Sequence, residues 1–118
     1  MEIKKNITGK LNSRCHTNCF KHSKEFKSDI YVGYFVEYIK GYISAIPHFF
    51  NVMDNEIIDT TLGSNHGFYF GKLVSKKYAN ANKMFDTELW KTLYSEKRIE
   101  NSVDLEKICN KYRLNKLN

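Results

Sequence analysis

The chain has 118 residues, 42% of them hydrophobic, with one proline and a net charge of +6. This size and composition predict one domain spanning residues 1–118 and exclude low-complexity disorder. No apolar run is long enough to span a bilayer, and the start MEIKKNITGKLN lacks the apolar core of a secretion signal. We therefore expect a cytoplasmic protein that does not bind membranes.

The positive charge is unevenly distributed along the chain. Residues 1–28 hold seven Lys or Arg against two Asp or Glu, residues 29–75 two against five, and residues 76–118 ten against six. The basic ends could bind an acidic partner. Nucleic-acid bases are usually held by exposed arginine and aromatic groups, and the chain has only three arginines. A nucleic acid is therefore a less favoured partner than a protein.

The segment LNSRCHTNCFKHSKEFK predicts a helix capped by Asn12 or Ser13. Four of its residues follow the spacing i, i+4, i+7 and i+11 and form one stripe, which we expect to face the core: Cys15, Cys19, His22 and Phe26. The odd count of three cysteines argues against a disulfide framework and favours reduced thiols.

The middle of the chain predicts antiparallel strands. IYVGYFVEYIKGYI is rich in β-branched and aromatic residues, which indicates two strands joined by a turn at Lys40 and Gly41. HFFNV, MDNE and IIDTTL predict a hairpin whose loop is built around Asp54 and Asn55, since both tolerate left-handed backbone angles. FYFGKLVS predicts a further strand, with Gly71 at a bulge or a close approach.

The remaining sequence predicts helices: KKYANANKMF, then TELWKTLYSEKR capped by Asp86, then VDLEKICNKYR capped by Ser102. We expect the tail LNKLN to fray. The fold class is therefore α+β, with an N-terminal helix carrying cysteine packed on an antiparallel sheet, followed by C-terminal helices. The last helix carries a stripe that should be buried: Leu105, Ile108, Cys109 and Tyr112.

Two polar residues of the predicted hairpin can meet. If its loop has two or four residues, the antiparallel register places His48 opposite Thr61 and Phe50 opposite Asp59. His48 and Asp59 then project from one face as diagonal neighbours, roughly 7 Å apart at the backbone. That spacing allows an imidazole to carboxylate hydrogen bond. A loop of three residues would place them on opposite faces.

These residues suggest thiol chemistry. Asp59 would hold the His48 imidazole in one tautomer and leave the other ring nitrogen to act as a base. Cys15 is the candidate nucleophile because backbone N–H groups and the helix dipole favour a thiolate in the first turn. Its own backbone N–H could donate to an oxyanion, with Asn12 or Asn18 as candidates for the second donor. Cys19 is the alternative nucleophile if the helix begins later.

This order of residues resembles the papain-like and transglutaminase-like cysteine enzyme superfamily, in which a cysteine opens a helix packed against a sheet carrying His and then Asp or Asn. PHFFNV followed by EIIDTTL is similar to the transglutaminase-like run whose second strand ends Asp-Pro-Thr. Small uncharacterised phage and bacterial members share Cys-aromatic-x-Asn, His-aromatic-Trp-Asn and Asp-Pro-Thr, then Tyr-aromatic-Gly. The overlap covers Ser13 to Val74, with Thr60 in place of proline and Phe50 in place of tryptophan.

The resemblance implies Cys15 in CHTN as the nucleophile, His48 as the base, Asp59 as its orienter, and Asn18 and Asn51 as supporting residues. It implies a thiol-dependent hydrolase or acyltransferase that acts on an amide or thioester bond of a protein or peptide, with no cofactor. The alternative is a non-enzymatic phage-type inhibitor or binding protein that uses the same fold and a basic surface to bind an acidic host partner.

A metal site is a competing use of the same side chains. Cys15, Cys19 and His22 share one predicted helix face, and His48 could supply a fourth ligand. Structural zinc usually requires short Cys-x-x-Cys turns, and this spacing is absent from the sequence. We therefore expect no metal at the site.

Overall fold

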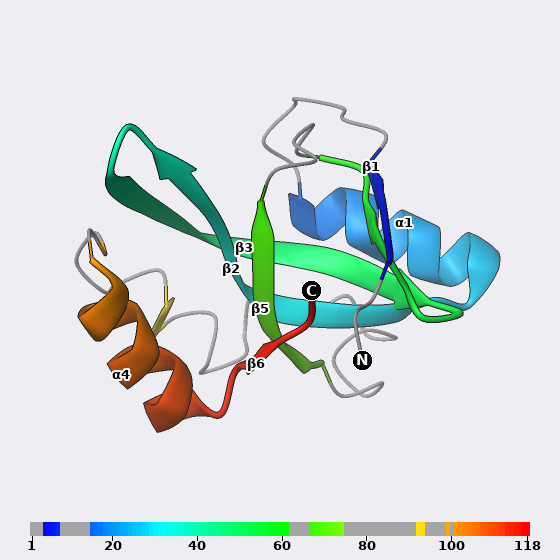
Figure 1. Cartoon of the computed structure of the whole chain (residues 1–118). Helices are drawn as coiled ribbons and strands as arrows, with labels where there is room; N and C mark the ends of the chain where they lie inside the picture. The colour runs from blue at the N-terminus through cyan, green and yellow to red at the C-terminus, as the bar shows by residue number, and fades with distance from the viewer. Residues whose placement is uncertain (1–3, 8–14, 62–66, 75–91, 94–98, 100) are drawn as a thin grey trace.

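The computed structural model describes residues 4–7, 15–61, 67–74, 92–93, 99 and 101–118 (Figure 1). Its helices are α1 (Cys15–Phe26) and α4 (Ser102–Tyr112), and its strands form one sheet in the order β1-β4-β3-β2-β5-β6. The α+β class is confirmed. The strands are β1 (Lys4–Ile7), β2 (Asp29–Ile39), β3 (Tyr42–Met53), β4 (Glu56–Asp59), β5 (Phe68–Leu73) and β6 (Asn115–Lys116).

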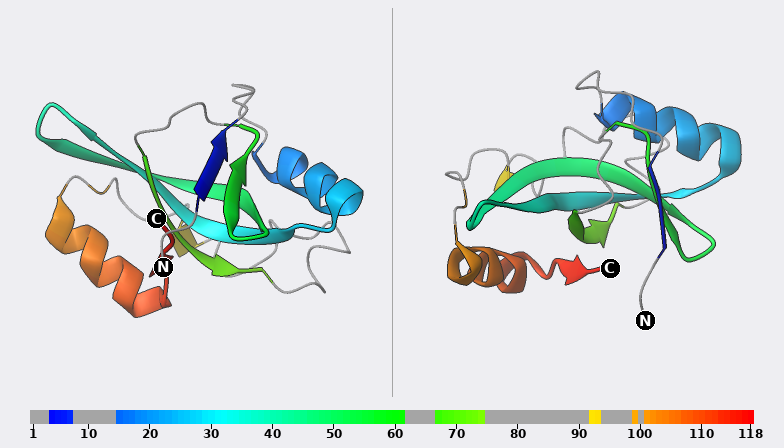
Figure 2. Two further views of the ribbon diagram at one scale, coloured as in Figure 1. Left: turned by 45° about the vertical axis from the view of Figure 1, so that its right-hand side comes forward. Right: turned by 45° about the horizontal axis from the view of Figure 1, so that its top comes forward.

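The sheet is antiparallel except at one edge, where β1 pairs in parallel with β4. The sequence KKNI has no clear alternation, and β1 was not predicted. Figures 1 and 2 place α1 and α4 at opposite ends of the molecule, with the N-terminal end of α1 nearest the middle of the sheet. Among the predicted C-terminal helices, α4 is described, whereas KKYANANKMF and most of TELWKTLYSEKR lie outside the described residues.

The long hairpin β2–β3 is the centre of the sheet. Its turn consists of Lys40 and Gly41, with φ of 47° and 83°, which are the left-handed angles that suit a two-residue turn between twisted strands. The predicted turn is confirmed. Strand β3 continues through Pro47, so two strands that the sequence predicted separately are one. Because β4 pairs with β3 only at residues 51–53, the missing N–H of Pro47 removes no bond from that ladder.

The next hairpin, β3–β4, carries the predicted histidine and aspartate. Asp54 and Asn55 form its two-residue turn, with φ of 52° and 59°. Strand β4 ends at Asp59, so the expectation that Thr61 pairs with His48 is wrong. The reason is local, because the Asp59 carboxylate accepts the backbone N–H of Thr61 at 2.9 Å and turns the chain out of the strand.

Alternating side chains build two core clusters. The first joins the sheet to both helices and includes Cys19 of α1 and Cys109 of α4. The second consists mainly of rings, with Phe35, Phe50, Ile57 and Tyr69 at its centre. The imidazole of His48 contacts three of these rings, with centroid separations of 6.2 to 6.5 Å.

Helix α1 departs from its predicted stripe at one end. Cys19 is buried and His22 is half-buried, but Phe26 is 52% exposed. Phe26 is the last residue of the helix, where α1 reaches the periphery of the sheet, and it packs on the ring of His22 instead (Figure 1). The predicted caps, Asn12 and Ser13, lie outside the described residues.

Helix α4 has the predicted buried stripe. Leu105 and Cys109 are buried, and Ile108 and Tyr112 pack against the same core. Its N-cap is Asn101 rather than Ser102, because the Asn101 side chain accepts the backbone N–H of Asp104 at 2.9 Å. None of the described helices has the length and apolar character needed to cross a membrane.

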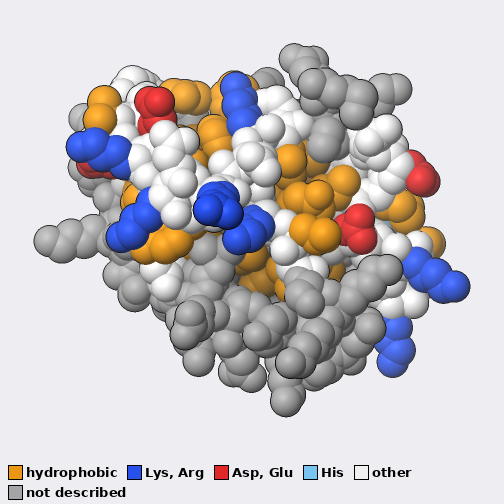
Figure 3. Space-filling view, turned by 90° about the horizontal axis from the view of Figure 1, so that it is seen from below, with side chains coloured by type: hydrophobic (Ala, Val, Ile, Leu, Met, Phe, Trp, Pro, Cys, Tyr) orange, Lys and Arg blue, Asp and Glu red, His pale blue; other side chains and the backbone are white. Residues whose placement is uncertain are grey.

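The residues after α4 are ordered, so the prediction of a frayed tail is wrong. Strand β6 pairs with β5, and the Leu117 N–H donates to the Tyr69 carbonyl at 2.8 Å. The backbone of this segment therefore finds its partners in the sheet. The surface nearby is basic, and Figure 3 shows lysine and arginine side chains over this side of the molecule. Its exposed cations include Lys107, Lys111, Arg113 and Lys116.

Strands β2 and β5 approach closely at Gly33 and Gly71, which pair directly. A Cβ added at Gly33 would lie 1.8 Å from the carbonyl oxygen of Phe70, and one at Gly71 would lie 2.8 Å from Cζ of Phe50. The predicted close approach at Gly71 is therefore confirmed. A side chain at Gly33 would force the two backbones apart.

We expect Gly33→Ala to lower the free energy of unfolding by at least about 2 kcal/mol, because the strain falls on backbone rather than on a flexible side chain. Ser44→Ala, at a half-buried position of β3, is the matched control and should change it by less than about 0.5 kcal/mol. Urea denaturation measures both. Equal small effects would show that β2 and β5 do not approach this closely.

Candidate active site

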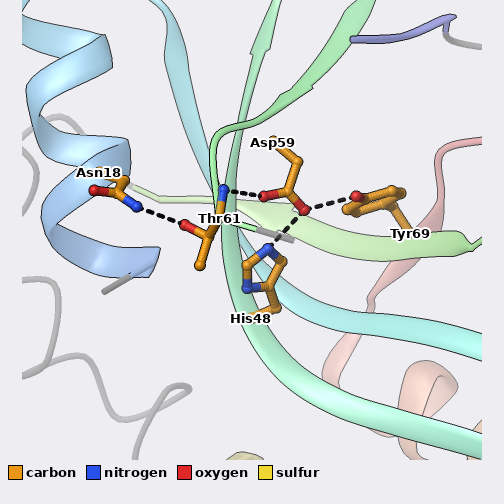
Figure 4. A network of polar contacts seen from close by, with 5 residues as sticks. All are labelled: Asn18, His48, Asp59, Thr61 and Tyr69. Carbon is orange, nitrogen blue, oxygen red and sulfur yellow. Dashed lines mark hydrogen bonds and ion pairs between the residues drawn. The ribbon is translucent and has the colours of Figure 1, made fainter. Parts of the chain in front are cut away.

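Asp59 is the centre of a buried polar network (Figure 4). Its Oδ2 accepts a hydrogen bond from Nε2 of His48 at 2.8 Å and another from the Tyr69 hydroxyl at 2.6 Å, while Oδ1 accepts the Thr61 N–H. His48 is 2% exposed, Asp59 1% and Tyr69 0%. A carboxylate shielded from water this completely needs donors in place of water, and these three groups supply them.

The predicted hydrogen bond between His48 and Asp59 is present. It follows from the two-residue turn, which sets the register of β3 against β4 and brings both side chains to one face. A carboxylate can only accept, so the proton in this bond belongs to Nε2. The lone pair of a neutral imidazole then lies on Nδ1.

Tyr69 reaches Asp59 from a distant strand. In the sheet order β3 and β2 separate β4 from β5, so the Tyr69 ring extends over the face of these strands. The ring packs on Phe35 and Phe50, with centroids 5.1 and 4.9 Å away. Gly33, between His48 of β3 and Gly71 of β5, leaves this part of the face without a side chain.

The pKa of Tyr69 is raised above its usual value, first by burial and then by the negative charge of Asp59 and the hydrogen bond to it. Glu37 and Cys19 make smaller contributions in the same direction. Tyr69 therefore stays protonated, and its hydroxyl remains a donor throughout the physiological range.

Asn18 links helix α1 to this network. Its Nδ2 donates to Oγ1 of Thr61 at 2.9 Å, and the backbone of Thr61 in turn donates to Asp59. Figure 4 shows the Asn18 side chain pointing from the helix toward Thr61. Cys15 is the first residue of α1, and its side chain lies outside the described part of the chain.

Asn51, the second predicted supporting residue, holds the helix rather than the histidine. Its Nδ2 donates to the Cys19 carbonyl and to Oγ of Ser28, both at 3.0 Å. Asn51 thus fixes α1 on β3.

Oγ of Ser28 also lies 2.7 Å from Nδ1 of His22. Burial lowers the pKa of His22, while the negative charge of Glu25 acts in the opposite direction.

Cys19 and Cys109 are buried thiols. Cys19 is 2% exposed and packs among the apolar side chains of the first core cluster, the surroundings of a structural thiol. Burial raises the pKa of Cys109 to about 11, so this thiol is protonated and unreactive at neutral pH.

Within the described ranges, no three side chains of the metal-ligating types gather where they could hold an ion. His22 is engaged with Ser28, and Nε2 of His48 is engaged with Asp59.

The comparisons with known proteins add no assignment. No protein-family model, curated protein or solved structure matches the chain. Sequence reasoning did not find the contacts of Thr61 and Tyr69 to Asp59, although Tyr69 lies in the Tyr-aromatic-Gly stretch that carried part of the resemblance.

We expect Asp59→Ala to lower the free energy of unfolding by about 3–5 kcal/mol, because three buried donors would lose their acceptor. Asp29→Ala is the matched control, since the Asp29 side chain is exposed, and it should cost less than about 0.5 kcal/mol. Denaturant unfolding measures both losses. Similar small losses would mean that the carboxylate does not organise a buried network.

The buried thiol of Cys109 predicts a pH dependence of stability. Its pKa rises from 9.0 to about 11 on folding, so the stability it contributes is full below pH 9 and is lost as the pH approaches 11. We expect the free energy of unfolding to fall over this interval, and to fall less in Cys109→Ala. Urea denaturation across the interval measures the difference, and equal slopes would contradict the assignment.

Proposed function

We propose that the protein is a thiol-dependent hydrolase or acyltransferase that acts on an amide or thioester bond of a protein or peptide. Cys15 is the nucleophile, His48 the base and Asp59 its orienter. The observation that supports the proposal is the buried hydrogen bond from Nε2 of His48 to Asp59, 2.8 Å long, which keeps the proton on Nε2 and the lone pair of the neutral ring on Nδ1.

The position of Cys15 in α1 supports its role. Residues three apart on a helix are neighbours on one side, and Asn18, three residues after Cys15, contacts Thr61 next to Asp59. Cys15 therefore begins the helical turn whose last residue, Asn18, ties α1 to the network. The first turn of a helix also favours a thiolate through its backbone N–H groups and dipole.

The proposed reaction proceeds through an acyl-enzyme. The Cys15 thiolate attacks the carbonyl carbon, and the protonated imidazole of His48 gives its Nδ1 proton to the leaving amine or thiol. Water or an amine then attacks the Cys15 thioester while Nδ1 takes up its proton. Hydrolysis or transfer results, and the Cys15 sulfur leaves as thiolate. A chain of 118 residues has little interior for a deep pocket, which favours an extended protein or peptide segment as the substrate.

The basic surface supports a second candidate, a non-enzymatic protein that binds an acidic partner. Exposed cations lie on α4 and β6, and Nζ of Lys116 sits 4.7 Å from the ring centroid of Phe68. Binding through such a surface weakens steeply as salt is added, and alkylation of Cys15 would leave it unchanged.

Intact-mass analysis after reaction with an activity-based electrophile, which a nucleophilic thiol attacks, tests the enzymatic proposal without knowledge of the substrate. We expect one modification at neutral pH, located at Cys15 and lost in Cys15→Ala. His48→Ala should slow the labelling on the order of 10²-fold, since the base is removed. Cys109→Ala is the control and should label at the wild-type rate. Equally slow labelling of Cys15 and Cys109 would contradict the proposal.

A further inference from the structure

We propose that Tyr69 is a positioning residue of the candidate active site: its hydroxyl, held in place through Asn118, sets how strongly Asp59 attracts the proton of His48. The consequence for catalysis rests on the proposed function. The effect of Tyr69 on the interaction between His48 and Asp59 does not depend on that function, and it can be measured without any substrate.

The two hydrogen bonds converge on one atom. Oδ2 of Asp59 accepts both the His48 imidazole and the Tyr69 hydroxyl, and the bond to the hydroxyl is the shorter at 2.6 Å. Donors that share an oxygen compete for its negative charge, and a short bond from a hydroxyl to a carboxylate is a strong one. Tyr69 therefore makes Asp59 a weaker attractor of the imidazole proton than it would be alone.

The packing of Tyr69 indicates that the role of its hydroxyl is the hydrogen bond to Asp59. The side chain is 0% exposed, and its ring packs on the buried rings of Phe35 and Phe50. A phenylalanine would make the same ring contacts without burying a hydroxyl. Because a buried hydroxyl is costly unless it is bonded, the contact with Asp59 is what stabilises tyrosine here.

The backbone of Tyr69 is held at both of its polar groups. Its N–H donates to Oδ1 of Asn118 at 2.7 Å, and its carbonyl accepts the Leu117 N–H. Nδ2 of Asn118 also donates to the Gly67 carbonyl at 3.0 Å, which ties down the residue where the chain enters β5. The segment after α4 therefore fixes the strand position from which the hydroxyl reaches Asp59.

The other titratable groups around Tyr69 come from different elements. Asp59 lies on β4, His48 on β3, Glu37 on β2 and Cys19 on α1. All of them remain when the hydroxyl alone is removed. Tyr69→Phe therefore isolates the effect of the hydroxyl on the interaction between His48 and Asp59.

The test is an NMR titration of the His48 ring in the full chain. In Tyr69→Phe, Asp59 keeps more of its negative charge for the imidazole, so we expect the midpoint of the titration to move to higher pH. Tyr31→Phe is the matched control, because Tyr31 stacks on Phe50 from the neighbouring strand β2, and it should leave the midpoint unchanged. A midpoint that is the same in wild type and Tyr69→Phe would overturn the proposal.

A second pair of variants tests the part played by Asn118 and covers a failure of Tyr69→Phe to fold. Asn118→Ala should move the midpoint in the same direction by a smaller amount. Asn115→Ala, in the exposed strand β6, should not move it. No movement in Asn118→Ala, or equal movement in both variants, would refute the role assigned to Asn118.

Labelling of Cys15 by an electrophile separates this inference from the proposed function. If Cys15 is not labelled but the His48 midpoint moves in Tyr69→Phe, thiol catalysis is wrong and the role of Tyr69 in the pair stands. If Cys15 is labelled and the midpoint does not move, the positioning role fails while the proposed function survives.

Discussion

The burial of one carboxylate, that of Asp59, requires several segments of this protein to meet at one place. Asp59 is 1% exposed and accepts hydrogen bonds from His48, Thr61 and Tyr69. Because an ionised group deprived of water is very costly without such partners, the segments that supply them must meet at one place. His48 comes from β3, Tyr69 from β5, and the chain beyond β4 turns back to present the Thr61 N–H. The fold around the sheet can be understood as the arrangement that satisfies this carboxylate.

Several simple structural features make this convergence possible. The two-residue turn at Asp54 and Asn55 sets which residues of β3 and β4 share a face. Gly33 and Gly71, which pair between β2 and β5, leave the sheet face between His48 and Tyr69 without side chains. Helix α1 then joins through Asn18, which brings its first turn to the network. Each link uses a backbone or steric rule, and together they connect an oriented imidazole, through Asp59 and Thr61, to Asn18 in the first turn of α1.

The sequence was most informative where short-range rules apply. Asp54 and Asn55, which tolerate left-handed backbone angles, indicated the turn, and the alternation of side chains along the strands then placed His48 near Asp59. The prediction that Thr61 lies opposite His48 extended the strand beyond Asp59. It was wrong because the Asp59 side chain accepts the Thr61 N–H and ends the strand. Tyr69 could not be assigned to Asp59 from the sequence, since that contact depends on the order of strands in the sheet. The tail was expected to fray for the same reason: its partner strand is distant in sequence and nothing local marks it.

One protonation state underlies the proposed function: the proton between His48 and Asp59 belongs to Nε2, and the proposed proton transfer then uses Nδ1. Nitrogen-15 NMR of the His48 ring tests it most directly, since the two nitrogens are distinguished by their shifts. We expect Nε2 to carry a proton at every pH at which the protein remains folded, with its N–H protected from exchange. A neutral ring with its proton on Nδ1 in the folded wild-type protein would contradict the account.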